Sequence, residues 1–285
     1  SGYVGNTNEL VNITDCALRR WFTLGYYADL FSKRLCTHLK VQHCLLTNSG
    51  SSANLLAITA LTSPRILLRR LLPGDEVVTT ACCFPTTVAP IIQNKLVPVF
   101  VDVDRHTFNI IPEQIEKVIS PKTKAIFLTH SFGNPVNMDK ILTIAQKHNL
   151  WVISDCCDSL GAKWKGQSVE TLGDIATTSF YPAHHITTGE GGAVFTNNDN
   201  LKRIIQSCRD WGRDCWCKPG DISNCNNRFQ FQFGDLPRGY DHKYIFTHIG
   251  YNLKMSDLHA SIGVAQLRKL GTFVRKRNEN FKYLY

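Results

Sequence analysis

Three polar segments carry residue types suited to binding a phosphate or doing acid–base chemistry. The first, LLTNSGSSANLLAITAL, places Asn48, Ser49, Gly50, Ser51 and Ser52 between an apolar run and a helix-like run. Backbone N–H groups at a helix start, with serine hydroxyls beside them, can bind a phosphate dianion. Capping of the helix by Ser51 or Ser52 explains the same residues, so the segment by itself leaves both interpretations open.

The second segment, WVISDCCDSLGA, contains two aspartates at the point where a strand is expected to end. Open α/β sheets commonly bind ligands at the carboxyl ends of their strands. Asp155 or Asp158 can therefore hold a proton on a heteroaromatic nitrogen. Either residue also suits an ordinary turn or helix cap.

The third segment, TTSFYPAHHITTGEGGAVFT, combines Ser179 with the adjacent His184 and His185 and a glycine-rich turn. A histidine on an irregular loop can act as an acid or a base near neutral pH. The alternative is a packed or surface histidine without a chemical role.

Eleven cysteines are present, an odd number with no secretory signal, which favours reduced thiols or metal ligands over a disulfide framework. Cys215, Cys217 and Cys225 form C-x-C followed after seven residues by a third cysteine. This spacing suits a metal centre that lacks one ligand, whereas a zinc knuckle more often uses C-x2-C. The alternative is that these cysteines are reduced thiols without a role in metal binding.

The elements that must position these residues alternate along the chain between β-branched runs and helical patterns. This rhythm predicts an α/β fold with a mainly parallel sheet covered by helices on both faces. Strands are expected at 76–80, 97–101, 125–129, 151–155, 175–179 and 193–196, and helices between them at 88–93, 115–119, 139–148 and 201–208. Further helices are expected at 9–22, 27–39, 256–270 and 274–285, whereas 213–248 is irregular and therefore functional or disordered.

Composition excludes several classes of protein. A chain of 285 residues with 43% hydrophobic and 19% charged residues predicts one large or two ordinary globular domains. No run reaches the roughly 18 apolar residues of a membrane-spanning helix, and no signal peptide opens the chain, which predicts a cytoplasmic protein. The net charge of +9 is scattered and suits an anionic small ligand better than nucleic acid.

Five segments, NSGSSANLLA, HSFGNPVNMD, ISDCCDSLGA, SFYPAHHITTGEGGAVFT and GYNLKMSDLHA, occur in this order. Together they resemble the fold-type I, vitamin B6-dependent sugar aminotransferase family of the DegT type, over residues 10–270. In that family a lysine that bonds covalently to pyridoxal phosphate occupies the position of His184. Imidazole cannot form that stable bond, so the resemblance implies a pyridoxamine phosphate held non-covalently, as in the sugar 3-dehydrase branch.

The resemblance also implies a role for each site residue. Phe84 stacks on the cofactor ring, Asp155 pairs with its nitrogen, and Asp158 contacts the ring hydroxyl or supports Asp155. Gly50, Ser51 and Ser179 bind the phosphate, with Asn252 added from a second subunit of a homodimer. A two-iron, two-sulfur cluster of the branch has the spacing C-x57-C-x-C-x7-C, which Cys157, Cys215, Cys217 and Cys225 match.

The activity implied is removal of the C3 hydroxyl from CDP-4-dehydro-6-deoxy-D-glucose, in 3,6-dideoxyhexose synthesis for lipopolysaccharide O-antigen. His184 takes the proton, and an NAD(P)H-dependent iron–sulfur flavin reductase supplies electrons through the cluster. The alternatives are a dTDP-linked substrate or an inactive B6-binding paralogue. The expected organisation is a helical segment (1–45), a cofactor-binding α/β domain (46–270) that includes an iron–sulfur loop (208–248), and the start of a truncated C-terminal small domain (271–285).

Overall fold

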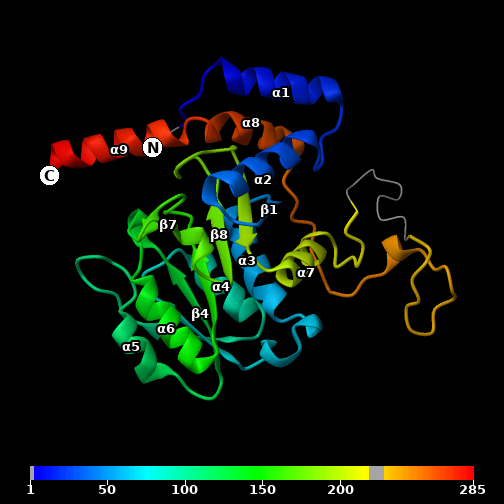
Figure 1. Ribbon diagram of the computed structural model, residues 1–285, viewed down its shortest axis with the longest axis horizontal. Coiled ribbons are helices and arrows are strands. Elements are labelled where there is room, and N and C mark those ends of the chain that lie inside the picture. The colour runs from blue at the N-terminus through cyan, green and yellow to red at the C-terminus, as the bar shows by residue number, and fades with distance from the viewer. Residues whose placement is uncertain (1–2, 218–227) are drawn as a thin grey trace.

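The computed structural model describes residues 3–217 and 228–285, and a seven-stranded sheet lies at its centre (Figure 1). Strand β9 runs against its neighbours β1 and β8, and the other strands of this sheet point in one direction, which confirms the expected mainly parallel sheet. In spatial order the strands are β1 (His43–Thr47), β9 (Gly192–Thr196), β8 (Ile175–Ser179), β5 (Trp151–Asp155), β4 (Thr123–Thr129), β2 (Glu76–Thr80) and β3 (Val97–Val101). A separate two-stranded ladder joins β6 (Lys163–Trp164) to β7 (Gln167–Ser168).

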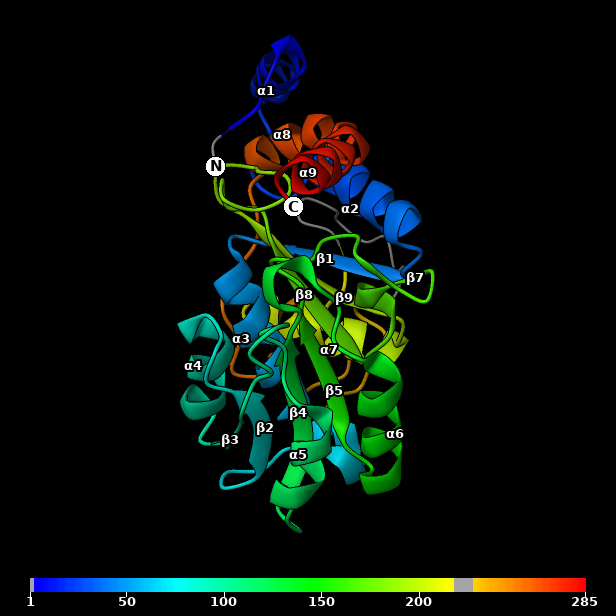
Figure 2. The ribbon, with the colours of Figure 1, turned by 90° about the vertical axis from the view of Figure 1, so that its left-hand side faces the viewer.

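Side chains alternate between the two faces of the sheet, and each face is covered by helices, as predicted (Figure 2). Phe127 and Ile153 point to the face that packs against α3, α4 and α7, whereas Ile126 and Val152 point to the face under α5 and α6. These helices are α3 (Gly50–Leu61), α4 (Pro85–Gln93), α5 (Pro112–Val118), α6 (Met138–His148) and α7 (Asp199–Arg209).

A further layer of helices lies at the top of Figure 1 and covers the end of the sheet that contains β1, β8 and β9. It consists of α1 (Thr7–Arg19), α2 (Tyr26–Leu39), α8 (Asp257–Leu267) and α9 (Leu270–Leu284). Beyond its first turns α9 projects from the body with mostly exposed side chains. Of the helices in the described ranges, none has the length and apolar character needed to cross a membrane.

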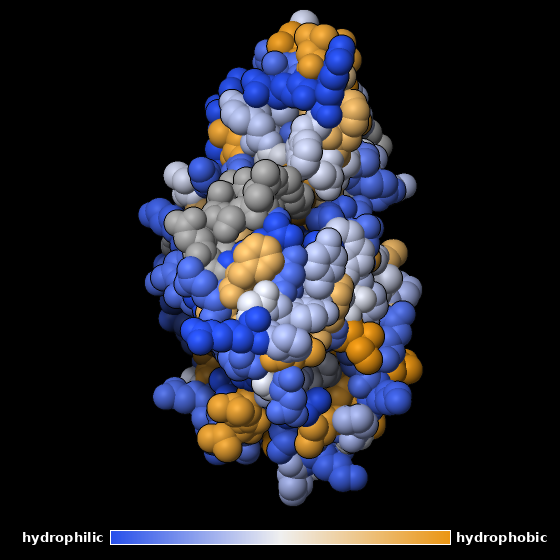
Figure 3. All heavy atoms as spheres, turned by 90° about the vertical axis from the view of Figure 1, so that its right-hand side faces the viewer, coloured by the Kyte–Doolittle hydropathy of each residue, from blue (hydrophilic) through white to orange (hydrophobic). Residues whose placement is uncertain are grey.

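The segment predicted to be irregular has little regular structure where it is described. Between Arg213 and His248 it holds turns, a single-turn helix at His242–Tyr244 and an isolated bridge between Arg213 and Phe246. Several of its aromatic side chains are exposed, among them Tyr244 and Phe246. On the side of the molecule that bears this segment, hydrophobic patches are separated by hydrophilic surface (Figure 3).

The start of α2 depends on a residue from the far end of the chain. Its N-cap, Gly25, has no side chain to accept hydrogen bonds, and Asp257 supplies the missing acceptor. The buried carboxylate accepts from the backbone N–H groups of Gly25, Tyr27 and Ala28 at 3.1, 3.2 and 2.7 Å. The first turn of α8 therefore holds the first turn of α2 in place.

We expect Asp257→Ala to lower the free energy of unfolding by about 2 kcal/mol or more, because buried N–H groups lose their acceptor. Urea unfolding followed by far-UV circular dichroism measures the change. Asp235→Ala, at an exposed position, is the matched control and should shift stability by less than about 0.5 kcal/mol. Equal stability of the two variants would show that α2 does not need this cap.

Candidate active site

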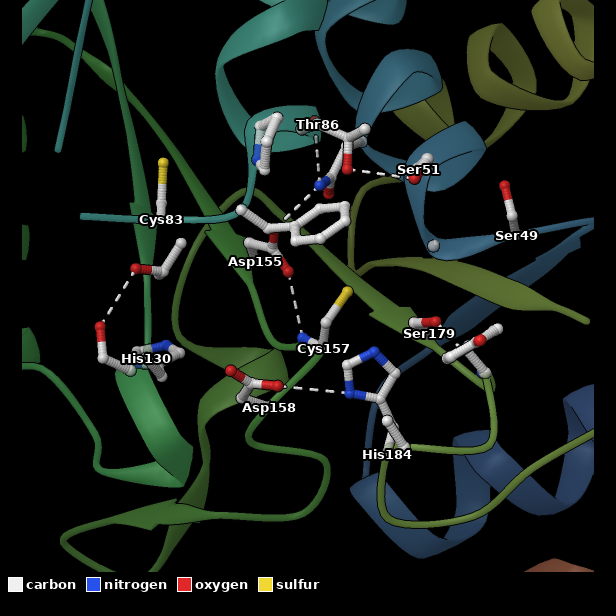
Figure 4. A pocket seen from close by; sticks show the side chains of 18 of the residues that line it. Ser49, Ser51, Cys83, Thr86, His130, Asp155, Cys157, Asp158, Ser179 and His184 are labelled. Atoms are coloured by element: carbon white, nitrogen blue, oxygen red, sulfur yellow. Dashed lines mark hydrogen bonds and ion pairs between the residues drawn. The ribbon is translucent and has the colours of Figure 1, made fainter. Parts of the chain in front are cut away.

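A cavity of about 760 Å³ opens at the edge of the sheet where β4, β5 and β8 end (Figure 4). This is the edge at which open α/β sheets bind ligands, and the volume is in the range of small-molecule sites. Its lining includes most residues that the sequence singled out, namely Gly50, Ser51, Phe84, Asp155, Cys157, Asp158, Ser179 and His184. The fold thus brings segments more than 130 positions apart into one site.

The start of α3 forms one wall of the cavity. Ser49 caps this helix by accepting a hydrogen bond from the backbone N–H of Ser52 at 3.1 Å. The cap is therefore Ser49, and the alternative that Ser51 or Ser52 caps the helix is wrong, because the helix begins at Gly50, before either residue. The hydroxyl of Ser51 instead donates to Thr86 Oγ1 at 3.1 Å beside the cavity.

Gly50 lies against Ser179, which ends β8. A Cβ atom added at Gly50 would lie 2.5 Å from the Cβ atom of Ser179. Only glycine leaves room there, and the N–H groups of the first helical turn have no partner inside the helix. The helix start and Ser179 together form a cradle for an anion such as a phosphate.

We expect Gly50→Ala to weaken the binding of a phosphorylated ligand at least tenfold, because the added methyl group pushes Ser179 out of the cradle and overpacks the site by about 1–3 kcal/mol. Isothermal titration with pyridoxamine phosphate measures the affinity. Gly271→Ala is the control, since a Cβ atom there meets nothing within 4 Å. Unchanged affinity of Gly50→Ala would place the phosphate elsewhere.

Asp155 lies at the floor of the cavity, 6% exposed and fixed by three hydrogen bonds. Its Oδ2 accepts from Asn54 Nδ2 and from Thr87 Oγ1, both at 2.8 Å, and its Oδ1 accepts from the backbone N–H of Cys157 at 3.1 Å. Asn54 is held in turn by Thr177, whose hydroxyl donates to Asn54 Oδ1 at 2.6 Å. All these partners are uncharged, so the carboxylate keeps its charge available for a cationic group in the cavity.

His184 faces Asp158 across the cavity, with Nδ1 3.3 Å from Asp158 Oδ1. The hydrogen bond from His184 lowers the pKa of Asp158 below its usual value, and burial, which acts in the opposite direction, is the weaker effect. Because a carboxylate accepts from Nδ1–H, the lone pair of the neutral imidazole is on Nε2. Figure 4 shows that nitrogen on the ring side away from Asp158, toward Cys157.

His185, next in sequence, does not line this cavity. It lines a second cavity of about 180 Å³ together with Lys276 and Arg277. Burial, with smaller contributions from Arg277 and His184, lowers the pKa of His185 to about 4. The structure therefore selects His184 from the histidine pair as the candidate base.

Of two further predicted site residues, Phe84 lines the cavity and Asn252 does not. Phe84 lines the cavity with 69% of its surface exposed, an apolar side chain that a bound planar ring can cover. Asn252 does not line it; its Oδ1 accepts from Lys254 Nζ at 2.6 Å on another part of the molecule.

The predicted cluster cysteines are only partly described. Cys157 lines the cavity, whereas Cys215 and Cys217 lie in the irregular segment and Cys225 lies outside the described residues. Within residues 3–217 and 228–285, no three His, Cys, Asp or Glu side chains are arranged to hold a metal ion. The described residues do not by themselves form a cluster site.

Sequence reasoning missed three buried polar residues. Asn54 and Thr87 fix Asp155, and His130 lines the cavity just after β4. An asparagine within the apolar run of α3 is the one local signal for the first of them. His130 opens the segment HSFGNPVNMD, although no role was predicted for it. Thr87 carries no comparable signal, because its importance depends on Asp155, 68 positions away.

The arrangement fits a phosphorylated nitrogen heterocycle. The start of α3 and Ser179 suit its phosphate, and Asp155 suits a protonated ring nitrogen. Phe84 offers an aromatic face, and His184 offers a base with an oriented lone pair. Pyridoxamine phosphate or pyridoxal phosphate has each of the groups that these residues would bind.

Comparisons with known proteins point to one family. The family model described as the DegT/DnrJ/EryC1/StrS aminotransferase family matches residues 5–285. The lipopolysaccharide biosynthesis protein RfbH of Salmonella typhimurium (strain LT2) is 55% identical over 100% of this chain and 65% of its own length. The dTDP-4-dehydro-2,6-dideoxy-D-glucose 3-dehydratase of Saccharopolyspora spinosa is 48% identical over 100% of this chain and 62% of its own length. The chain thus spans somewhat less than two thirds of either relative.

Solved structures with lower sequence identity share the fold of this chain. A mutant of GDP-4-keto-6-deoxymannose-3-dehydratase (ColD) with bound GDP-perosamine superposes with a TM-score of 0.87 and 29% identity, over 99% of this chain and 70% of that chain. The E. coli GDP-4-keto-6-deoxy-D-mannose-3-dehydratase with bound hydrated PLP gives the same TM-score, identity and coverage. The expected fold is therefore confirmed.

Proposed function

Because the chain belongs to the DegT/DnrJ/EryC1/StrS aminotransferase family, we propose that it is a pyridoxamine phosphate-dependent sugar-nucleotide 3-dehydrase. Similar proteins are named as sugar-nucleotide 3-dehydratases and aminotransferases, so the question is which of the two reactions this site favours. The observation that carries the proposal is His184, which faces Asp158 in the cavity at the position where the resemblance expects a lysine.

The residues of this chain divide the work. Asp155 keeps a proton on the ring nitrogen, and Asn54 and Thr87 keep Asp155 in place. Asp158 holds the Nδ1–H of His184, so that Nε2 can take a proton from the aminomethyl carbon of the bound cofactor and Asp158 can stabilise the resulting imidazolium. When bound, pyridoxamine phosphate would supply an amine for the 4-keto group of the sugar and a ring that takes up the electron pair freed by removal of the proton and returns it as the C3 hydroxyl leaves.

For the substrate we propose CDP-4-dehydro-6-deoxy-D-glucose, in 3,6-dideoxyhexose synthesis for lipopolysaccharide. Its support is the resemblance together with the similarity to a lipopolysaccharide biosynthesis protein. The second candidate is a dTDP-linked sugar, favoured by the 48% identity to a dTDP-sugar 3-dehydratase. Both candidates use the same chemistry at C3 and differ in the nucleotide base.

The test is an assay of C3 oxygen loss with pyridoxamine phosphate. Substrates labelled with oxygen-18 at C3, one linked to CDP and one to dTDP, are incubated side by side, and labelled water is measured. We expect release that depends on pyridoxamine phosphate and is faster for the CDP sugar. Amination of the sugar with glutamate as donor, without oxygen loss, would instead assign the protein to the aminotransferases, and no turnover at all would favour an inactive paralogue.

We further propose that Cys157, Cys215, Cys217 and Cys225 ligate a two-iron, two-sulfur cluster that receives electrons from an NAD(P)H-dependent iron–sulfur flavin reductase. The support is their spacing in the sequence, since the described residues do not gather a ligand set. Iron and acid-labile sulfide in anaerobically purified protein test the cluster, with two of each expected per chain. Anaerobically purified protein that holds no iron or sulfide, yet forms the 3-deoxy product with the reductase, would contradict it.

A homodimer that shares Asn252 between two active sites is the last part of the proposal. Asn252 is exposed and lies outside its own cavity. Near it, Trp211, Phe246 and Ile249 are exposed, the last at 96%, and exposed apolar side chains are typical of protein interfaces. Sedimentation velocity of the protein with and without pyridoxamine phosphate measures the oligomeric state.

A further inference from the structure

His130 is a buried histidine with one ring nitrogen unused. Only 1% of the residue is exposed, and its Nδ1 accepts a hydrogen bond from the backbone N–H of Val136 at 3.1 Å. Because Nδ1 is an acceptor, the proton of the neutral ring is on Nε2. Among the described residues Nε2–H has no partner, and the residue lines the main cavity.

A buried N–H donor that lines a cavity and has no acceptor can be satisfied by a ligand bound in that cavity. Leaving such a group without a hydrogen bond is costly, and burial lowers the pKa of His130 to about 4, so the ring is neutral at physiological pH. His130 therefore has one proton to donate and carries no charge. Its role differs from that of His184, whose Nδ1 faces a carboxylate.

The order of the strands fixes which part of a bound B6 ring meets His130. Strand β5, which ends in Asp155, lies between β8 on one side and β4 on the other. Ser179 ends β8 beside the start of α3, whereas His130 directly follows β4. Figure 4 shows the same arrangement, with Ser51 and Ser179 on one side of Asp155 and His130 on the other.

A ring with its nitrogen on Asp155 and its phosphate arm toward Ser179 presents its opposite edge to β4. In pyridoxamine phosphate that edge carries the C2 methyl group and the C3 oxygen. We propose that His130 Nε2–H donates a hydrogen bond to this C3 oxygen and so holds it in the ionised, phenolate form. The inference rests on the proposed function, because it assumes that the cavity binds this cofactor.

Asp158 cannot provide the same interaction. As a carboxylate it only accepts hydrogen bonds, and it already accepts from His184. A phenolate oxygen facing Asp158 alone would meet a like charge, whereas His130 offers a neutral donor. His130 is accordingly a positioning residue that also sets the charge on the ring oxygen.

The experiment compares pyridoxamine phosphate with its 3-deoxy analogue, which lacks the C3 oxygen, by isothermal titration. The unmodified protein should bind the cofactor roughly ten- to a hundredfold more tightly than the analogue, as expected for a hydrogen bond to a charged group. His130→Phe should bind both within about twofold of each other. His130→Gln, whose amide can donate from a similar place, should recover part of the preference, and His38→Phe, outside the cavity, should behave as the unmodified protein.

The absorption spectrum gives a second readout. At a fixed neutral pH the band of the bound cofactor should move from that of the phenolate to that of the neutral phenol in His130→Phe. An unchanged spectrum and an unchanged preference in a folded His130→Phe variant would overturn the inference and leave the proposed function standing. Failure of the unmodified protein to bind pyridoxamine phosphate at all would overturn both.

A test on the unmodified protein remains informative if the variants do not fold. In protein labelled with nitrogen-15 at histidine, the His130 Nε2–H resonance should shift more with pyridoxamine phosphate than with the 3-deoxy analogue. Equal shifts with the two ligands would also overturn the inference.

Discussion

We expect Asp155→Ala to reduce dehydration by about 10²- to 10³-fold or more, the effect of removing a preorganised electrostatic partner. Without the carboxylate, the ring nitrogen loses the charge that keeps it protonated, and the ring takes up less readily the electron pair freed when His184 removes the proton. Asn54 and Thr87 also lose the acceptor that both of them share. Single-turnover oxygen-18 release measures the rate, and titration with pyridoxamine phosphate measures the accompanying loss of affinity.

Two variants separate this electrostatic role from a structural one. Asp155→Asn keeps the size of the side chain and removes its charge, so it should be nearly as slow as Asp155→Ala. Asp174→Asn alters an aspartate at the opposite end of the same strands, where Asp174 Oδ2 accepts from the backbone N–H of Val152 at 2.8 Å. It should keep its cofactor affinity, and a comparable loss in Asp174→Asn would indicate that the Asp155 effect is only loss of folding.

The second large effect is expected for His184→Lys, which places a primary amine in the cavity beside Asp158. The amine should bond covalently to pyridoxal phosphate, and dehydration should fall by about 10²- to 10⁴-fold because the imidazole base is gone. Borohydride reduction followed by mass spectrometry of the peptide measures the covalent bond independently of activity. The unmodified protein should show no such adduct.

The neighbouring histidine provides the control for this change. His185→Lys introduces the same amine one position along, on the side of the second cavity, and should not form the adduct. An adduct at a lysine of the unmodified protein would contradict the role given to His184. Full dehydration by His184→Lys would contradict it as well.

The sequence by itself determined the class of fold and much of the site. Strands such as Trp151–Asp155 and Ile175–Ser179 were predictable to the residue, because β-branched runs bounded by polar turns are local patterns. Asp155 and His184 could be picked out from local patterns as well, since Asp155 ends a strand and His184 lies in the loop that follows another. Five short segments that resemble the DegT-type family predicted the cofactor, because each can be read from consecutive residues alone.

The tertiary structure alone decided which residues act together. It placed Asp158 beside His184, joined Asn54 to Asp155 across 101 positions, and capped α2 with Asp257 from 229 to 232 positions away. It also left His130 with an unused donor in the cavity. Such contacts join side chains that are distant in sequence, and their energies depend on geometry and burial created only when the sheet is assembled, so no local pattern records them.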